Sequence, residues 1–374
     1  MRGGYGIFYD RTPTNTLIAA SSNPPFAGIA NIFDGNIDNP GGGVSRNFPP
    51  NMTVFPRQLK TPSIMSYNVG IQHELPHSVL VDIAYVGNLG RHLARSININ
   101  QLQEGARLSP PASNINVNAL RPYLGYGSIS VRDQGDNSNY NSLQVAASRR
   151  IRQGFSISAN YTFSKALDDT SGTPQNAFNS RPDYGLSAVH RAHALNVNYI
   201  YELPLSRRSS STLLRQALGG WEISGVTIYQ SGAPNTVSVP VDIARIGAGS
   251  SRATVVGDPN LPKNQRTLAH WFNAEAFLAP EQMVPGRFGN SGRNILIGPG
   301  FNQWDMSLLK NFRFTEARSV QFRAELFNVF NHASFTGLNT TVRFDAAGRP
   351  TQSYGAVNAS GPGRVLELGL KLLF

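Results

Sequence analysis

Residues 155–164 read Phe-Ser-Ile-Ser-Ala-Asn-Tyr-Thr-Phe-Ser, an unbroken alternation of apolar and polar side chains. Successive side chains of a β-strand point to opposite faces, so a repeat of two residues predicts a strand with one apolar and one polar face. The end of the chain repeats this pattern. There Leu366, Leu368, Leu370, Leu372 and Phe374 alternate with Glu367, Gly369 and Lys371.

Eight further segments alternate in the same way, three of them more weakly because glycine interrupts the pattern. They lie at residues 3–9, 67–74, 79–85, 142–150, 195–201, 221–231, 304–308 and 320–326. Together with 155–164 and 366–374 they make ten candidate strands. The sequence therefore predicts an all-β fold of about ten strands.

The connections between these segments alternate in length. Those at 75–78, 151–154 and 313–318 are short, and the one at 203–220 is intermediate. Long connections rich in Gly, Pro, Asn and Ser lie near 10–65, 88–141, 165–192, 232–302 and 329–363. In an antiparallel sheet all the short turns then fall at one end. Outer-membrane barrels have short periplasmic turns and longer extracellular loops.

This parity predicts an antiparallel transmembrane β-barrel segment in the cell outer membrane. The apolar side chains are expected to face lipid and the polar ones a wet lumen. No apolar run reaches the roughly 18 residues that a membrane helix needs. Helical membrane proteins are therefore excluded.

The composition removes several kinds of chemistry. The chain has 374 residues, 15% of them charged, a net charge of +11 and no cysteine. Disulfides, thiolate zinc sites, iron–sulfur clusters and cysteine nucleophiles are thus excluded. Lys and Arg are scattered, with no basic run of 5–8 residues. We therefore expect no nucleic-acid partner.

The last segment, residues 363–374, resembles the terminal strand of bacterial outer-membrane proteins, which commonly end in Phe. In that class the assembly machinery of the barrel reads this strand. The resemblance implies that the apolar side chains of the segment form the assembly signal. These are Leu366, Leu368, Leu370, Leu372 and Phe374.

A second resemblance concerns residues 321–332, Gln-Phe-Arg-Ala-Glu-Leu-Phe-Asn-Val-Phe-Asn-His. They are similar to the penultimate strand of TonB-dependent receptors, above all of the Oar-like branch. Segments 3–10, 84–87, 161–166 and 289–294 match the same branch. The resemblance implies a 22-stranded barrel around an N-terminal plug, driven by a TonB-type energising complex. It also implies uptake or surface binding of a bulky organic ligand.

Residues 1–9 carry no export signal, and no segment resembles the plug or the motif for the energising complex. We therefore expect residues 1–374 to be the C-terminal portion of such a receptor barrel, from a truncated gene, a misassigned start or a split locus. The alternative is a self-contained ten-stranded barrel that acts as an omptin-like protease, an adhesin or a passive pore.

Three groups of residues have the chemistry of a site without its full pattern. His190 and His193 are spaced as a metal pair but lack further ligands. Residues 133–138 are rich in oxygen ligands but lack the spacing and the closing Glu of a calcium loop. Asp168 and Asp169 with His190 are the residue types of omptins, yet they share one loop.

We therefore predict no catalytic, cofactor-binding or metal-binding residues, no cofactor and no enzyme activity. Residues 4–6 and 125–127, both Gly-Tyr-Gly, lack the third glycine of a dinucleotide loop and are expected in a strand and a loop. Arg323 and Glu325, two residues apart on the predicted lumen face, are expected to neutralise charge locally.

Overall fold

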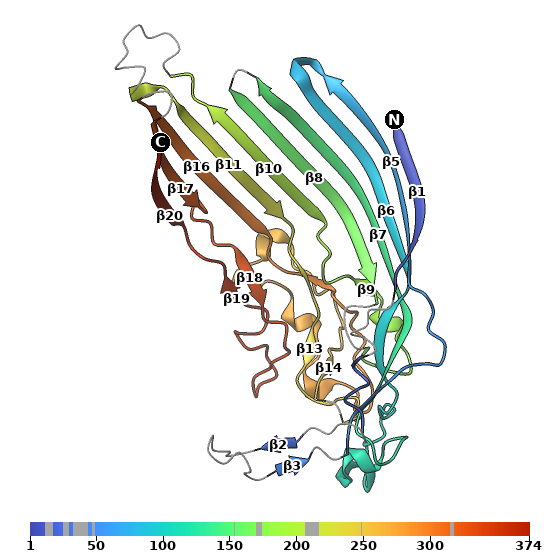
Figure 1. Ribbon diagram of the computed structural model, residues 1–374. Coiled ribbons are helices and arrows are strands. Elements are labelled where there is room, and N and C mark those ends of the chain that lie inside the picture. Colours follow the sequence, from blue (N-terminus) through green and yellow to red (C-terminus); the bar gives the residue numbers. More distant parts are fainter. Residues whose placement is uncertain are drawn as a thin grey trace.

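The computed structural model describes residues 1–11, 18–24, 30–32, 44–46, 49–152, 154–169, 174–205, 217–247, 249–314 and 318–374. Its main element is one curved antiparallel sheet (Figure 1). Ten strands pair in chain order: β1 (Arg2–Tyr9), β5 (Ser63–Leu75), β6 (Val79–Asn98), β7 (Ile129–Arg152), β8 (Phe155–Asp168), β10 (His193–Glu202), β11 (Trp221–Gln230), β16 (Phe301–Arg313), β17 (Ser319–Phe327) and β20 (Val365–Leu373). The all-β prediction, its ten strands and their antiparallel order are confirmed.

The register of the sheet brings the apolar phases of all ten strands onto one face. Directly paired residues share a face. Leu368 lies opposite Ala324, which lies opposite Leu308, and that residue lies opposite Ile223. The row continues on the far side of the sheet, where Val145 pairs with both Tyr161 and Ile83.

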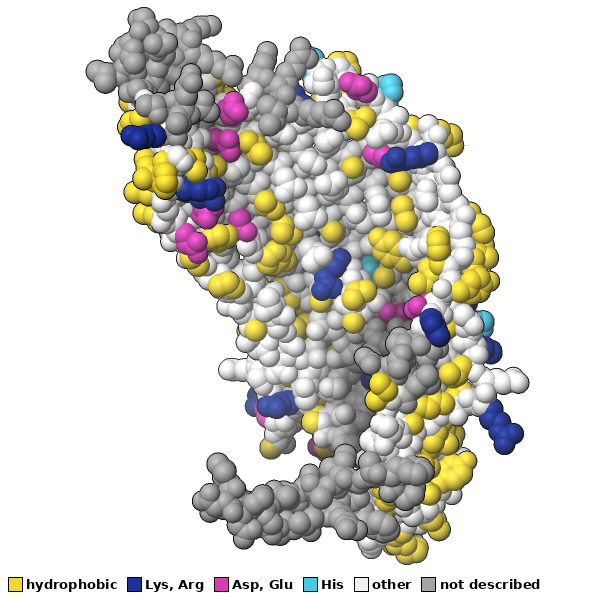
Figure 2. Space-filling view, viewed as in Figure 1, with side chains coloured by type: hydrophobic (Ala, Val, Ile, Leu, Met, Phe, Trp, Pro, Cys, Tyr) yellow, Lys and Arg dark blue, Asp and Glu magenta, His cyan; other side chains and the backbone are white. Residues whose placement is uncertain are grey.

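The other face collects the polar phase. Asn196 pairs with Asn160, which pairs with Ala146, and Ser224 pairs with Ser307. White dominates the middle of the face seen in Figure 2, which marks uncharged polar side chains and backbone. A sheet with one apolar and one polar face is what a barrel wall between lipid and a wet lumen requires.

The two ends of the sheet differ as the sequence predicts. The short turns after β5, β7 and β16 lie together at one end, and the long connections lie at the other (Figure 1). The connection expected at 88–141 is shorter, because β6 runs to Asn98 and β7 begins at Ile129. Their hairpin extends past the neighbouring strands, with a register shift near Leu93.

Shorter strands and turns lie in the long connections. The strands are β2 (Ala30–Ile32), β3 (Val44–Arg46), β4 (Met52–Val54), β9 (Gly185–Leu186), β12 (Pro234–Asn235), β13 (Ser238–Val239), β14 (Ser251–Arg252), β15 (Leu296–Ile297), β18 (Phe335–Leu338) and β19 (Val357–Ser360). The 3₁₀ turns are η1 (Pro76–Ser78), η2 (Ala112–Asn114), η3 (Val117–Ala119), η4 (Arg181–Asp183), η5 (Lys263–Gln265), η6 (Ala274–Ala276) and η7 (Pro280–Gln282). Among the described residues, no helix has the length and apolarity to cross a membrane.

The sheet is open. β1 and β20 are its two edges and lie on opposite sides of the wall (Figure 1). In the described part of the chain, β1 pairs only with β5 and β20 only with β17. The ten strands therefore do not close on themselves.

Candidate functional site

Described residues of the main sheet line two hollows on its lumen face, among others. The larger, of about 550 Å³, lies over β8, β10, β11, β16 and β17, and its lining includes Ser156, Ser158, Asn198, Ser224 and Ser307. The second, of about 440 Å³, lies over β1 and β5–β8. Apolar side chains such as Ile200, Met306 and Phe327 share the wall of the first hollow with these hydroxyl and amide groups. This hollow can therefore contact polar and apolar groups alike.

Acidic side chains add negative charge to this face. Glu325 and Asp305 line the larger hollow, and Glu367 lies directly opposite Glu325 in the register. Arg323 Nη1 lies 3.6 Å from Glu325 Oε1, which confirms the expected local neutralisation for that pair. Figure 2 shows charged side chains gathered over β16, β17 and β20, near the short turns.

At the opposite end, the connections 231–300 and 328–364 fold together around their own core. We call these two connections the outer module. Ten buried residues form the core: Val237, Val239, Ala253, Phe272, Ala276, Phe277, Met283, Leu296, Val342 and Tyr354. The rings of Phe272 and Tyr354 pack edge to face, 5.3 Å apart. The N–H of Val342 donates to the carbonyl of Ser238 at 2.8 Å, and that of Trp271 to Gly355 at 2.9 Å.

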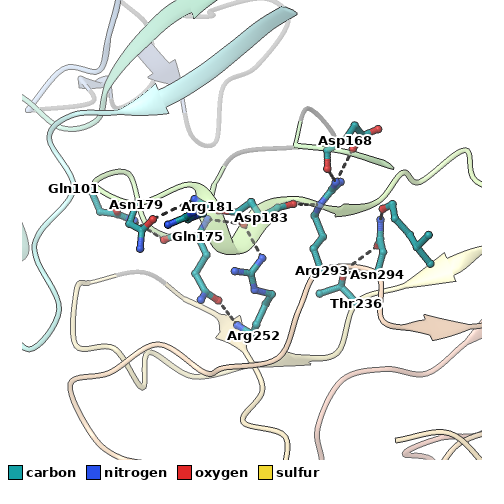
Figure 3. A network of polar contacts seen from close by, with 11 residues as sticks. Gln101, Asp168, Gln175, Asn179, Arg181, Asp183, Thr236, Arg252, Arg293 and Asn294 are labelled. Atoms are coloured by element: carbon teal, nitrogen blue, oxygen red, sulfur yellow. Dashed lines mark hydrogen bonds and ion pairs between the residues drawn. The ribbon is translucent and has the colours of Figure 1, made fainter. Parts of the chain in front are cut away.

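A network of buried polar groups fixes the outer module to the ends of β8 and β9 (Figure 3). Arg293 Nη2 donates to Asp168 Oδ1 at 2.5 Å, and its Nε donates to the carbonyl of Asp183 at 2.6 Å. Arg252 Nη1 donates to Asp183 Oδ1 at 2.6 Å. Asn294 Nδ2 donates to the carbonyl of Leu186 at 2.6 Å.

Connection 99–128 also joins this assembly. Leu102 packs with Ala244 and Ile246 of the outer module in a small apolar cluster. The side chain of Gln101 bonds the backbone of Gln175 and Ala177 in connection 165–192. Four outer connections, 99–128, 165–192, 231–300 and 328–364, are thus interlocked into one cap at the loop end of the sheet.

The structure brings together two acidic segments that lie apart in the sequence. Ser138 pairs with Asp168, and Asp169 Oδ1 accepts from the N–H of Asn137 at 2.5 Å. Arg95 forms two hydrogen bonds with Asp133, and its Nη1 lies 3.9 Å from Asp136. These groups sit where the β6–β7 hairpin extends beyond the sheet, above the apolar band.

Asp136 has the most perturbed acidity of this cluster. Burial above all, and then the charge of Asp169, raise the pKa of its carboxyl to about 7. Arg95 lowers the pKa, while Asp133 and Asp168 raise it. In the folded protein this carboxyl therefore binds its proton far more tightly than a solvated aspartate does.

We expect the β6–β7 extension to be more stable at pH 5 than at pH 8. The folded pKa of Asp136 lies above the unfolded one, so its stabilising effect is complete at low pH and is lost as the pH rises toward 7 and beyond. Hydrogen exchange of residues 129–138 measures this difference. Asp136→Asn should remove most of it.

Asp345→Asn is the matched control. The pKa of Asp345 is lowered, mainly by a backbone hydrogen bond from Arg349, so this group stays charged from pH 5 to 8. If Asp136→Asn keeps the pH dependence of the parent, the assignment of that dependence to Asp136 is wrong.

Two histidines, His190 and His193, form hydrogen bonds at the rim of the sheet. His190 is buried, and its Nδ1 accepts from the N–H of Ala166 at 3.3 Å. Burial lowers the pKa of His190, and the charges of Arg191 and Lys165 lower it further. His193 bonds the Tyr161 hydroxyl at 2.7 Å. Among the described residues, no group of three or more His, Asp or Glu is arranged to hold a metal ion.

The sequence-predicted assembly residues lie on the open edge strand β20. Leu366, Leu368, Leu370 and Leu372 are exposed on the apolar face, and Phe374 follows the end of the strand. The two Gly-Tyr-Gly motifs lie where they are expected, in β1 and in the connection after β6.

The sequence reasoning missed the bonding groups of the cap. Arg252 and Asp183 carry no local pattern, and Arg293 stood out only as part of the segment 289–294. Charged residues that are buried in pairs look like ordinary surface residues in a sequence. Their role depends on connections that meet only in the folded chain.

A protein-family model described as "Outer membrane beta barrel domain" matches residues 1–367. A search of curated proteins finds no match. Several solved structures follow a similar backbone course. The outer membrane transporter YddB from Escherichia coli is 11% identical, with a TM-score of 0.49, and the match covers 99% of this chain and 38% of that one.

The siderophore receptor PirA from Acinetobacter baumannii is 10% identical, with a TM-score of 0.46, and the match covers 100% of this chain and 38% of that one. The FrpB iron transporter from Neisseria meningitidis is 11% identical, with a TM-score of 0.41 and coverages of 86% and 32%. This chain thus spans 38% of the length of YddB and of PirA. At such identities no residue role is transferred.

Proposed function

We propose that this chain, which belongs to the outer membrane β-barrel domain family, is part of a larger receptor. The proposed receptor is TonB-dependent and of the Oar-like branch, and the chain is the C-terminal portion of its barrel. Its place is the outer membrane. The proposed role is uptake or surface binding of a bulky organic ligand. The segment resemblances described above support this assignment of branch and role.

The observation that carries the proposal is the open, two-faced sheet. Its apolar side needs lipid and its polar side needs a wet lumen, yet the outer edges of β1 and β20 lack partners among the described residues. An unpaired backbone group in hydrocarbon costs several kcal/mol, so open edges are not tolerated there. The edges therefore call for further strands, as a larger barrel supplies.

The lumen face supports a plug as the missing partner. Barrels of 22 strands have a plugged lumen. The hollow over β8–β17 offers hydroxyl and amide groups together with Asp305 and Glu325. A folded domain that presents basic groups beside apolar ones fits this mixed, acidic wall. The TonB-type energising complex would then act on that domain from the periplasm.

The self-contained ten-stranded barrel is the weaker alternative. It needs pairing between β1 and β20, which the described strands lack. Its protease form needs free acidic and imidazole groups at the outer rim. Asp168 instead accepts from Arg293, and His190 accepts from the backbone of Ala166. We therefore propose no enzyme activity.

One experiment separates the two functions. Residues 1–374 are expressed behind an added signal peptide, and uptake of candidate organic ligands is measured with and without the energising complex. We expect no uptake that depends on the complex, because ten strands with two open edges do not form a closed wall. A heat-modifiable, protease-resistant barrel formed by these residues alone would instead favour the ten-stranded alternative.

Replacing Phe374 with Asp should lower the amount of folded receptor in the outer membrane severalfold. The apolar residues of β20 and the terminal ring are the proposed signal for the assembly machinery, and a charge at that position removes the aromatic group. Membrane fractionation with a heat-modifiability gel gives the readout. Phe374→Tyr is the control, and equal amounts of folded barrel for the Asp and Tyr variants would contradict the signal.

A further inference from the structure

The apolar face of the sheet becomes polar near its loop end. There the hydroxyls of Tyr67 and Tyr85 both donate to Asn141 Oδ1, at 2.9 and 2.7 Å. Asn141 lies on the same face of β7 as Val145, nearer the loop end, and Lys165 of β8 lies directly opposite it. A polar row of this kind on the lipid side of a barrel marks the level of the lipid headgroups.

The other boundary of the apolar band lies at the short turns. Arg149 shares the face of Val145 on β7, and its guanidinium lies over the ring of Phe155, 5.7 Å from the centroid. The stretch 141–149 has nine residues, and a tilted transmembrane strand needs roughly 9–11. Lys165, opposite Asn141, therefore lies at the outer boundary of the hydrocarbon.

Positive charge collects at this outer boundary, between the ends of β8 and β10. Lys165 is exposed. Arg191 comes just before β10, and its carbonyl accepts from Ser164 Oγ at 2.8 Å, next to Lys165 in the chain. The charges of Lys165 and Arg191 both lower the pKa of His190, which places the two cations near the same ring. Exposed His193, the first residue of β10, adds an imidazole.

The carboxylates of the same connection do not neutralise these cations. Asp168 and Asp183 form ion pairs with arginines of the outer module, and Asp169 accepts from a backbone N–H. In the described part of the chain, neither Lys165 nor Arg191 forms an ion pair with a carboxylate. The site therefore has the charge that an anionic group requires, and phosphate forms strong charge-assisted hydrogen bonds with such cations.

The next row of the same face, toward the membrane centre, is apolar. Tyr85 pairs with Leu143, Leu143 with Phe163, and Phe163 with His193. The side chains of Tyr85, Leu143 and Phe163 are 43%, 42% and 51% exposed. A phospholipid or lipid A presents acyl chains and phosphate in this same order across the interface. A free phosphate ion would leave the apolar row unused.

We propose that Lys165, Arg191 and His193 form a binding site for the phosphate group of a lipid in the outer leaflet, with Phe163 and Leu143 against its acyl chains. Lys165 and Arg191 lie at the two ends of connection 165–192, so one phosphate bound to both fastens the segment that carries Asp168 and Asp183. This goes beyond the proposed function, because it concerns the lipid side of the wall and needs neither ligand nor energising complex.

The test compares two lipids that differ only in phosphate. The protein is extracted from outer membranes in detergent, and its thermal unfolding is followed at rising concentrations of lipid A or of dephosphorylated lipid A. We expect lipid A to stabilise the protein at severalfold lower concentrations. Equal effects of the two lipids would overturn the phosphate site. Equal stabilisation by inorganic phosphate at the same concentration would mean a site for a free anion, and would also overturn the proposal.

The double variant Lys165→Gln/Arg191→Gln tests the residues. It should weaken the effect of lipid A severalfold and leave that of dephosphorylated lipid A unchanged. Lys263→Gln is the matched control, because Lys263 is an exposed cation of connection 231–300, away from the sheet. It should respond to lipid A as the parent does. Equal responses of the double variant and the control would contradict the assignment.

Hydrogen exchange of the parent protein provides a test that needs no variant. Binding of lipid A should slow exchange of residues 184–192 severalfold, because the phosphate holds the two ends of their connection. Residues 237–239, in the core of the outer module, should not change. Exchange of 184–192 that is the same with lipid A and with dephosphorylated lipid A would contradict the proposed site.

Discussion

Phe277→Ala is expected to destabilise the outer module by about 3–5 kcal/mol, the usual cost of deleting a buried aromatic side chain. Phe277 is 2% exposed and packs edge to face on Phe272. Its removal opens a cavity beside Phe272 and Tyr354 in a core of only ten buried residues. Hydrogen exchange of residues 235–297 measures the free energy of local opening.

Leu268→Ala serves as the control for this loss. Leu268 lies in the same module but is 50% exposed, so its truncation should change the opening free energy by less than about 0.5 kcal/mol. Similar effects of the two substitutions would mean that the module has no independent core.

Val197→Arg should lower the stability of the barrel wall in the membrane by about 2–4 kcal/mol, as expected for Arg on a lipid-facing strand near the bilayer midplane. Val197 lies near the middle of β10, opposite Ala159 and Thr227 on the apolar face. Denaturant titration of the receptor in vesicles measures the change. The amount of folded protein in the outer membrane gives a second readout.

The neighbouring substitution Asn198→Arg tests the assignment of the two faces. Asn198 lies on the same strand but lines the larger lumen hollow, where a guanidinium stays solvated. It should therefore cost much less than Val197→Arg. A larger loss for Asn198→Arg than for Val197→Arg would contradict the assignment of the two faces.

The strands of the wall are predictable from sequence because each is specified by a pattern of neighbouring residues. Alternation in 155–164 and 366–374 reports directly which side chains face lipid, and the order of short and long connections reports the topology. The same reasoning placed Arg323 beside Glu325 on one face. All ten strands follow from patterns that span fewer than about a dozen residues each.

The cap is not predictable in this way. In its core Phe277 packs with Tyr354, and an ion pair joins Arg293 to Asp168. Both contacts link residues that lie far apart in the chain. Each contact depends on how connections without regular periodicity meet in space. The sequence pattern also underestimates the length of the β6–β7 hairpin, for a related reason. Polar and glycine residues at 88–98 resemble a loop, yet pairing with 129–138 makes them strand.

The in-phase register of the wall limits how this sequence can change in length. From β8 to β17 the pairing runs without a shift between β8 and β10, β10 and β11, β11 and β16, and β16 and β17. Deleting one residue inside such a strand turns every following side chain to the opposite side, placing serine and glutamate against lipid. Insertions and deletions in this family are therefore expected to accumulate in the outer connections, while strands gain or lose residues only in twos.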